Sequence, residues 1–188
     1  MEGLVDKKLV LAIAGFALGI VVALGGFALS RDGNESTATT YGDWKLSCPS
    51  RNAASAECAL TQDIMQSGTG MTLVHMQLVG GSSSGNQLLI VVPHGVLLQP
   101  GLGLVIGRNP LQVLRYKTCD SVGCLAYLPL DSATLDALRE DDSGRIVVVW
   151  RDGKELAYPC SFRGLTKGVS AYGWASFKRS SLLGRLLP

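Results

Sequence analysis

Histidine is scarce in this sequence, and the two histidines do not form a site. His75 falls in an expected strand and His94 in a Pro-His-Gly turn. A metal centre needs three or four ligands that converge on the ion, and no spacing in the sequence brings the histidines together with other ligands. The sequence therefore predicts no metal site, and no motif predicts a bound cofactor.

A catalytic nucleophile is also hard to find. The segment Gly81–Gly85 matches the pattern G-x-S-x-G, with Ser83 at its centre. A nucleophile elbow needs a strand before the serine, a helix after it, and a downstream acid and histidine. Here the flanking residues are polar, the next segment resembles a strand, and His94 is the only later histidine. We expect no catalytic residues, and the hypothesis of an enzyme rests on Ser83 alone.

An excess of charge of one sign is missing too. The chain has 17 Lys and Arg residues against 15 Asp and Glu, which gives a net charge of +2. The basic residues are scattered, whereas a protein that binds nucleic acid gathers them in a patch. Nothing in the sequence favours nucleic acid as a partner, and no small-molecule substrate is evident.

Charge is absent altogether from one long segment near the N-terminus. Residues Leu9–Leu29 form an apolar run of 21 residues. As a helix this run is about 31 Å long, which matches a hydrocarbon core of about 30 Å. We expect a transmembrane helix over residues 9–29 that acts as a signal anchor in the lipid bilayer. Lys7 and Lys8 precede it, which places residues 1–8 in the cytoplasm and the rest of the chain on the far side.

A cleaved signal peptide is the alternative interpretation of this run. Lys7 and Lys8 also fit a positive n-region, and Ala28–Ser30 is a passable cleavage site. A signal h-region has about 7–15 residues, so the run is longer than a signal peptide requires. Both interpretations deliver the rest of the chain to the same compartment.

Small residues recur every four positions within the apolar run, at Gly15, Gly19 and Ala23. A ridge of small residues lets another helix approach closely in a membrane. This ridge is a candidate helix-packing site for an integral membrane protein complex or for a second copy in a homo-oligomer. Because glycine is common in membrane helices, an ordinary composition remains the alternative.

The remaining sequence favours an all-β fold with a single β-sandwich domain. Glycine is abundant, with 23 residues, and strand-forming residues dominate the later segments. We expect a flexible linker over residues 30–40, the domain over 41–177 and a C-terminal tail over 178–188. Short strand-like segments recur between turn residues, as in a sandwich or barrel. They are Tyr41–Cys48, Ala56–Asp63, Gly70–Val79, Leu88–Val92, Val96–Leu98, Leu102–Ile106, Leu111–Thr118, Val122–Leu128, Arg145–Trp150 and Glu155–Phe162.

Two segments have helical periodicity. One short helix is expected over Asp131–Arg139, capped by Asp131 or Ser132. The segment Phe177–Pro188 is too short to form a stable helix alone. It is either a frayed end or a segment that docks on a membrane surface or partner. The docking alternative comes from the leucines on one helical face of this segment, Leu182, Leu183, Leu186 and Leu187.

All five cysteines lie beyond the apolar run. In an exported domain, cysteines are usually oxidised to disulfides. Cys48 and Cys58 fall on the inward face of neighbouring strands, so we infer a bridge between them. Cys119 and Cys124 are close enough in sequence to bridge around a tight turn. Cys160 alternates with apolar residues and is expected to be a buried, inert free thiol. Two bridges among five cysteines allow 15 arrangements, so this pairing is a prediction.

Several short motifs, taken in order, resemble the invasion-associated locus B family. They are Tyr41-Gly42-Asp43-Trp44 followed by Cys48 and Cys58, Val92-Pro93-His94-Gly95-Val96-Leu97-Leu98 followed by Pro100-Gly101-Leu102, Cys119 with Gly123-Cys124, the helix after Asp131, and Ser161-Phe162-Arg163-Gly164-Leu165. The resemblance covers about residues 41–175. It implies a periplasmic or surface β-sandwich of alphaproteobacterial type with two such bridges, no known catalytic residues and no cofactor. Cys160 and the retained span depart from the family pattern.

These observations favour a non-enzymatic accessory protein anchored in the bacterial inner membrane by a single span. Its C-terminal domain would lie in the periplasm and act by binding. The expected partner is an integral membrane complex, such as a respiratory, photosynthetic or envelope assembly. The alternative is a secreted or surface-exposed invasion-associated factor that binds host or envelope components.

Overall fold

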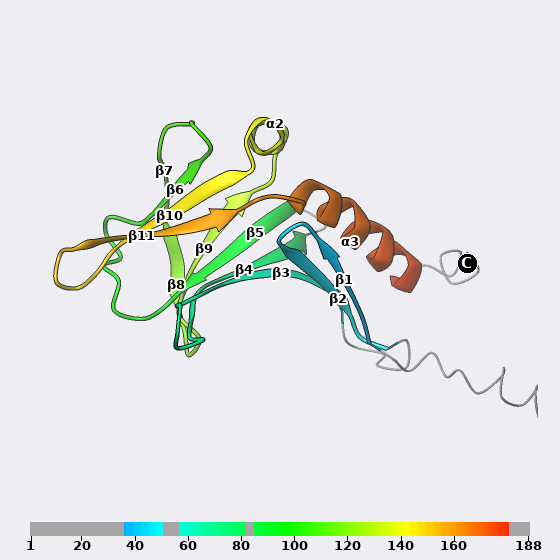
Figure 1. The fold of residues 1–188 in the computed structure, drawn as a ribbon, viewed down its shortest axis with the longest axis horizontal. Coiled ribbons are helices and arrows are strands. Elements are labelled where there is room, and N and C mark those ends of the chain that lie inside the picture. The colour runs from blue at the N-terminus through cyan, green and yellow to red at the C-terminus, as the bar shows by residue number, and fades with distance from the viewer. Residues whose placement is uncertain (1–35, 51–56, 82–84, 181–188) are drawn as a thin grey trace, which may run out of the picture. The chain divides into compact units, whose positions relative to one another are not determined.

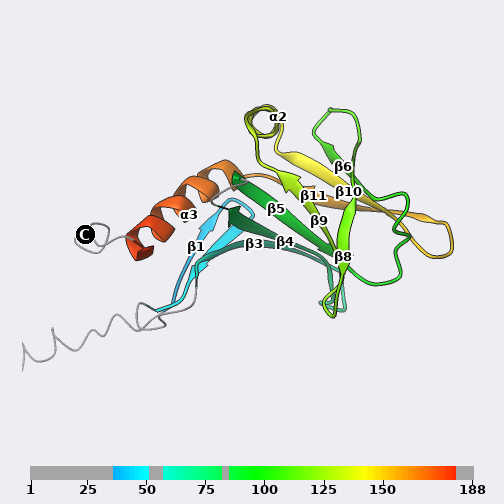
Figure 2. The same ribbon diagram turned by 180° about the vertical axis from the view of Figure 1, so that it is seen from behind.

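The residues that the structure describes form two antiparallel β-sheets and two helices (Figure 1, Figure 2). This computed structural model describes residues 36–50, 57–81 and 85–180. The seven-stranded sheet contains, in spatial order, β1 (Thr37–Tyr41), β2 (Trp44–Cys48), β3 (Ala59–Met65), β4 (Thr72–Gly81), β5 (Gly85–Val92), β9 (Cys124–Pro129) and β8 (Tyr116–Cys119). The four-stranded sheet contains β11 (Glu155–Ser161), β10 (Ser143–Val149), β6 (Leu102–Ile106) and β7 (Gln112–Leu114). The helices are α2 (Ser132–Glu140) and α3 (Leu165–Ser180).

Alternating side chains give the sheets a buried inner face. In β4 the side chains of Val74, Met76 and Leu78 are buried, while those between them are more exposed. Met76 pairs with Ile90 and Leu78 with Leu88 on β5, so the buried residues of adjacent strands lie on one face. This period of two is the pattern of an antiparallel sheet with one face on the core.

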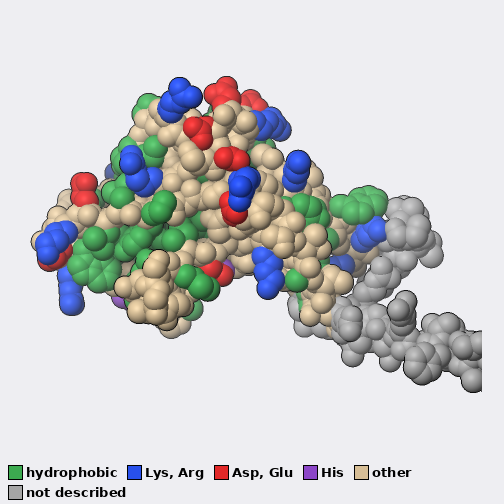
Figure 3. All heavy atoms as spheres, in the orientation of Figure 1, with side chains coloured by type: hydrophobic (Ala, Val, Ile, Leu, Met, Phe, Trp, Pro, Cys, Tyr) green, Lys and Arg blue, Asp and Glu red, His purple; other side chains and the backbone are tan. Residues whose placement is uncertain are grey.

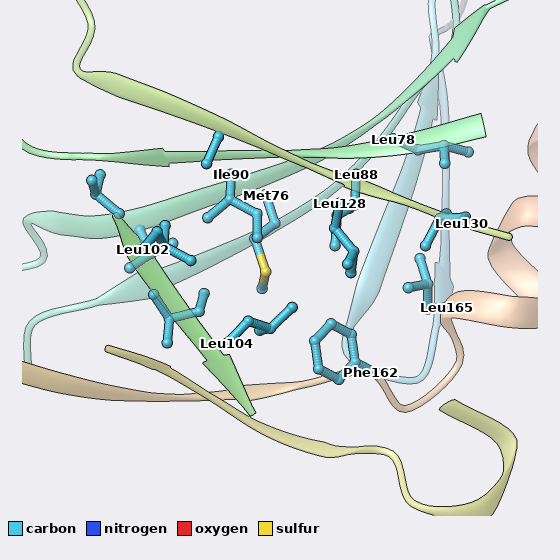
Figure 4. Packing of buried hydrophobic residues seen from close by; sticks show 14 of the residues in the cluster. Met76, Leu78, Leu88, Ile90, Leu102, Leu104, Leu128, Leu130, Phe162 and Leu165 are labelled. Carbon is cyan, nitrogen blue, oxygen red and sulfur yellow. The ribbon is translucent and has the colours of Figure 1, made fainter. Parts of the chain in front are cut away.

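The core lies between the inner faces of the two sheets. Figure 4 shows Met76 and Ile90 of one sheet pointing toward Leu102 and Leu104 of the other. Phe162, which follows β11, extends the same cluster toward the start of α3. The arrangement is the β-sandwich that the sequence predicts.

Helix α3 covers the part of the seven-stranded sheet nearest β1, β2 and β3. Its first residue, Leu165, is fully buried in the core. A Cβ atom on Gly168 would lie 2.9 Å from the side chain of Leu60, which is itself fully buried on β3. The absence of a side chain at Gly168 therefore lets the helix approach the inner face of the sheet.

Beyond the apolar run the sequence predicts one short helix, whereas the described residues form two. The expected helix is α2, and the side chain of Asp131 caps it by accepting a hydrogen bond of 2.8 Å from Thr134 N. The second helix, α3, is missing from the prediction because Gly168, Gly173 and Val169 are poor helix formers. The helix α3 is therefore stabilised by its packing against the sheet and not by local helix propensity.

Three expectations about strands are wrong. Residues 111–118, expected as one strand, are divided between β7 of the four-stranded sheet and β8 of the seven-stranded sheet. Residues 37–40, expected to belong to the linker 30–40, form most of β1, whose backbone pairs with β2 from Thr37↔Cys48 to Tyr41↔Trp44. This strand is polar and exposed, so it lacks the alternation that marks a strand in sequence. Residues 96–98 form no strand, and within them only Val96 makes an isolated bridge, to Trp150.

The candidate transmembrane helix, residues 9–29, lies outside the described residues. So do its helix-packing positions Gly15, Gly19 and Ala23, and the segment 181–188 of the C-terminal tail. In the part of the chain that the structure describes, no helix is long and apolar enough to cross a membrane.

Two glycines hold the β1–β2 turn against the start of α3. Gly42 and Gly164 have φ angles of 58° and 89°. A Cβ atom on Gly42 would collide with the carbonyl oxygen of Arg163, and one on Gly164 would collide with the carbonyl oxygen of Tyr41. Close backbone approach and positive φ together require glycine at both positions.

We expect Gly164→Ala to lower the free energy of unfolding by more than about 2 kcal/mol, because it adds a steric clash to an unfavourable φ. Gly153→Ala is the matched control, since Gly153 has a φ of 82° but no atom within 4 Å of its Cβ position. That variant should lose only about 1 kcal/mol. Urea unfolding of the full-length protein in mild detergent, followed by tryptophan fluorescence, measures both. Equal losses would show that the contact with Tyr41 adds nothing.

Candidate functional site

The structure joins the two cysteine pairs that the sequence predicts. A disulfide between Cys48 and Cys58 links the end of β2 to the residue before β3. A second, between Cys119 and Cys124, closes the turn between β8 and β9. Both bridges lie within the seven-stranded sheet, so they fix its strands locally and do not join the two sheets.

Cys160 is the free cysteine among the described residues. It lies on the inner face of β11, where its register partner is Gly144 of β10. Burial raises the pKa of the Cys160 thiol to about 12. Because the thiolate is the reactive form, a thiol in this environment is a poor nucleophile and a poor metal ligand.

We expect Cys160 of the folded protein to be alkylated by iodoacetamide at pH 8 at least about a hundredfold more slowly than after unfolding in guanidinium chloride. The reason is its raised pKa and its burial. The measurement is intact mass against time without a reductant, which should show a single added group after unfolding. Rapid modification of the folded chain would mean that this thiol is accessible.

The two histidines lie in separate contacts. His75 Nδ1 is 2.6 Å from Asp63 Oδ1, and His94 Nε2 is 2.6 Å from the carbonyl oxygen of Asp120. The described part of the chain contains no group of three or more His, Cys, Asp or Glu arranged to hold a metal ion. Ser83, at the centre of the GSSSG segment, lies outside the described residues.

A polar network at the β1–β2 turn is the most connected set of side chains in the described domain. The two carboxylate oxygens of Asp43 accept hydrogen bonds from Arg163 Nη2 at 2.7 Å and Ser161 Oγ at 2.6 Å. Gln62 donates to the carbonyl oxygen of Asp43 at 3.1 Å and accepts from Ser161 N at 3.3 Å. Trp44 Nε1 donates to the carbonyl oxygen of Ser161 at 3.2 Å.

This network is suited to holding the fold together and not to catalysis. The hydrogen bonds from Arg163 and Ser161 lower the pKa of Asp43, which makes its carboxylate a weaker base. Ser161 Oγ already donates to Asp43 and accepts from Arg163 N at 3.1 Å, and both histidines contact other residues. The network therefore ties the N-terminal hairpin to the β11–α3 connection.

We expect Asp43→Asn to lower the free energy of unfolding by about 1 kcal/mol at pH 7, a value reduced for the partial exposure of the pair. The loss should shrink as the pH falls below about 4. The carboxylate stabilises the fold above its unfolded-state pKa, and this stabilisation disappears as the pH falls through the lower folded-state pKa.

Asp136→Asn is the control, because Asp136 pairs with Arg139 on the exposed surface of α2. Urea unfolding of both variants from pH 7 to pH 3 measures the difference. A loss for Asp43→Asn that does not change with pH would contradict the assigned role of its charge.

The outer face of the four-stranded sheet is apolar across all four strands. The cross-strand register aligns Ala157 of β11, Val147 of β10, Gly103 of β6 and Val113 of β7. Leu111 folds over Gly103, since its Cδ1 atom lies 3.0 Å from the Cβ position of that glycine. We call Leu111, Val113, Val147 and Ala157 the apolar face.

The apolar face is open to solvent and bordered by charge. Val113 has an exposed fraction of 57% and Leu111 of 52%, and Ala157 is exposed as well. Arg145 and Glu155 lie two residues from Val147 and Ala157 on the same side of their strands. Figure 3 shows hydrophobic side chains gathered over the half of the molecule that holds β6, β10 and β11, with charged side chains scattered around them.

The sequence predicts a strand over Arg145–Trp150, which contains most of β10, but it does not single out this surface. The sequence does contain a pattern that indicates an apolar outer surface, because residues 146–149 are Ile-Val-Val-Val, with no polar residue between them. A continuous apolar run of this kind places apolar side chains on both faces of the strand. It is typical of strands that are buried on both faces. In the structure the inner face, with Ile146 and Val148, is buried, while the outer face has no cover among the described residues.

The family of the chain follows from the comparison with known proteins. The model of the family described as invasion-associated locus B (IalB) protein matches residues 44–173. The chain belongs to the IalB family. The match begins at Trp44 in the polar network and ends within α3. It confirms the resemblance to this family, and the matched range includes the VPHGVLL and SFRGL segments.

Related proteins share both the sequence and the fold. Invasion protein B homologues of Brucella abortus, from strain 2308 and from biovar 1 strain 9-941, are each 30% identical to this chain over 160 residues. The match covers 83% of this chain and 88% of each homologue. The crystal structure of invasion-associated protein B from Bartonella henselae matches with a TM-score of 0.61 and 18% identity, over 73% of this chain and 96% of the other. The IalB family is named for invasion and not for an enzymatic activity.

Proposed function

We propose that this protein is a non-enzymatic accessory subunit anchored in the bacterial inner membrane by residues 9–29. Its β-sandwich lies in the periplasm, and the apolar face binds the periplasmic part of an integral membrane complex. A respiratory, photosynthetic or envelope assembly would offer such a part.

The observation that carries this proposal is the uncovered apolar face. An antiparallel sheet with one solvated side normally alternates apolar and polar residues, so its outer side is polar. Here Leu111, Val113, Val147 and Ala157 form an apolar centre, and Arg145 and Glu155 border it. An apolar centre with a polar rim is the composition of a protein–protein interface.

The N-terminal sequence supports the membrane part of the proposal. The run over residues 9–29 has no charge, and one charged residue at its centre would cost about 3 kcal/mol. Gly15, Gly19 and Ala23 supply a second contact, through which a helix of the same complex packs closely.

A secreted or surface-exposed invasion factor is the second candidate. The Brucella homologues carry the name invasion protein B, and Ala28–Ser30 fits a cleavage site. In that case the apolar face binds a host or envelope component, and no membrane span remains on the mature chain.

Intact mass of the native protein, alkylated without reduction, separates the two candidates. A mass that retains residues 1–30 supports the anchored subunit, and a mass that starts at Arg31 supports the released factor.

Val113→Glu should abolish co-purification of the partner complex from mild detergent, because it places a charge in the centre of the apolar face. Val122→Glu should leave co-purification intact. Val122 has an exposed fraction of 70% and lies in the β8–β9 turn, outside the apolar face. The measurement is the amount of stoichiometric partner recovered with each tagged full-length variant. Recovery of no partner with the unmodified protein, or equal recovery with both variants, would count against the proposal.

A further inference from the structure

Helix α3 presents two aromatic side chains to solvent near its C-terminal end. Trp174 and Phe177 have exposed fractions of 52% and 43%. Their rings stack with centroids 5.8 Å apart, and Lys178 Nζ lies 5.3 Å from the centroid of the Trp174 ring. Exposed tryptophan and phenylalanine beside lysine are unusual on a solvated helix face, where large apolar side chains cost free energy.

The same helix is basic. Its sequence, LTKGVSAYGWASFKRS, contains three basic residues and no acidic residue. On the helical period of 3.6 residues, Lys167, Trp174 and Lys178 fall on one face, and Phe177 borders it. At the end of the molecule formed by α3, Figure 3 shows hydrophobic side chains next to Lys and Arg side chains. We call Lys167, Trp174, Phe177 and Lys178 the aromatic–basic face.

The last turn of α3 lies at the end of the domain where the described chain begins. Arg179 Nη1 donates a hydrogen bond of 2.8 Å to the carbonyl oxygen of Pro49, directly after β2. The adjacent residue, Cys48, pairs with Thr37, the first residue of β1. Figure 1 and Figure 2 agree that α3 and β1 occupy one end of the molecule and the β10–β11 hairpin the other.

The length of chain before β1 limits how far this end can lie from a membrane. Residues 30–36 separate the apolar run from Thr37. Fully extended, such a segment spans at most about 25 Å, and a flexible one has a root-mean-square span of about 15 Å. On such a linker, Thr37 can lie no more than about 25 Å from the end of the apolar run.

We infer that the aromatic–basic face of α3 contacts the lipid headgroup layer of the membrane that holds residues 9–29. This inference rests on the proposed anchor and adds a second membrane contact. Tryptophan is enriched at the level of the headgroups, and phenylalanine is typical of the apolar face of a helix that lies in the membrane interface. Lys167 and Lys178 complement anionic lipids, which attract basic side chains near the surface.

This contact orients the domain. With α3 on the bilayer, the β10–β11 hairpin at the other end points away from the membrane. The apolar face, which includes residues of β10 and β11, is then presented to the periplasmic part of a partner.

Quenching of Trp174 by brominated lipids tests the contact directly. The full-length protein is reconstituted into phosphatidylcholine vesicles that contain phosphatidylglycerol, with bromine on the upper part of the acyl chains. We expect part of the tryptophan fluorescence to be quenched, and Trp174→Phe to abolish that part. Trp150→Phe is the control and should retain it, since Trp150 lies at the base of the β10–β11 hairpin.

Charge is tested by a second variant. Lys178→Glu should reduce the quenched fraction in vesicles with phosphatidylglycerol and have a smaller effect in phosphatidylcholine alone, because it reverses a charge that faces anionic lipid. Unchanged circular dichroism and thermal midpoints show that the variants are folded.

Failure of the contact and failure of the anchor give different results. Carbonate extraction reports whether the chain is integral to the vesicles. An integral chain whose Trp174 is not quenched overturns this inference and leaves the proposed function standing. Cross-linking of Trp174 variants to a second copy, without quenching, overturns it in favour of a dimer contact.

Should the chain prove not to be integral, the proposed anchor fails, and binding to preformed vesicles decides the inference. Binding to anionic vesicles that Trp174→Phe and Lys178→Glu weaken supports the surface contact. Absence of binding overturns it.

Discussion

The inner face of the seven-stranded sheet has to be covered across its whole width, and the four-stranded sheet covers only one part. Apolar side chains of β2 and β3, including Leu60, would otherwise face water. Helix α3 supplies the rest of the cover, with Leu165 in the core and Gly168 against Leu60. The domain is therefore a sandwich on one side and a helix packed on a sheet on the other, with Phe162 between them.

That division depends on the chain turning sharply after β11, and the polar network holds the turn. Asp43 receives hydrogen bonds from Ser161 and Arg163, and Gly42 and Gly164 let the two backbones touch. These residues lie in the GDW and SFRGL segments of this chain. These motifs are consequently explained by how the first hairpin meets the last helix.

Much of this architecture could be predicted from local patterns. Alternating residues predict β4 and β5, and the aspartate at 131 predicts the start of α2. The inward faces of neighbouring strands predict the Cys48–Cys58 bridge, and a short separation predicts the Cys119–Cys124 bridge. The contacts that were missed join distant residues. Asp43 and Ser161 are 118 positions apart, and α3 is stabilised by Leu60, on another element. The apolar face shows a further limit, because an apolar strand such as β10 does not reveal which of its faces the domain itself covers.

The order of the cysteines along the chain also bears on which disulfides can form first. The bridged pairs are separated by 10 and 5 positions, and Cys160 follows all four of them along the chain. When the chain emerges from its N-terminus, each pair can close before Cys160 appears. The unpaired thiol then meets no free partner, and the docking of β11 against β10 partly buries it. The order of the cysteines along the chain and the packing of β11 against β10 thus both disfavour mispairing with Cys160.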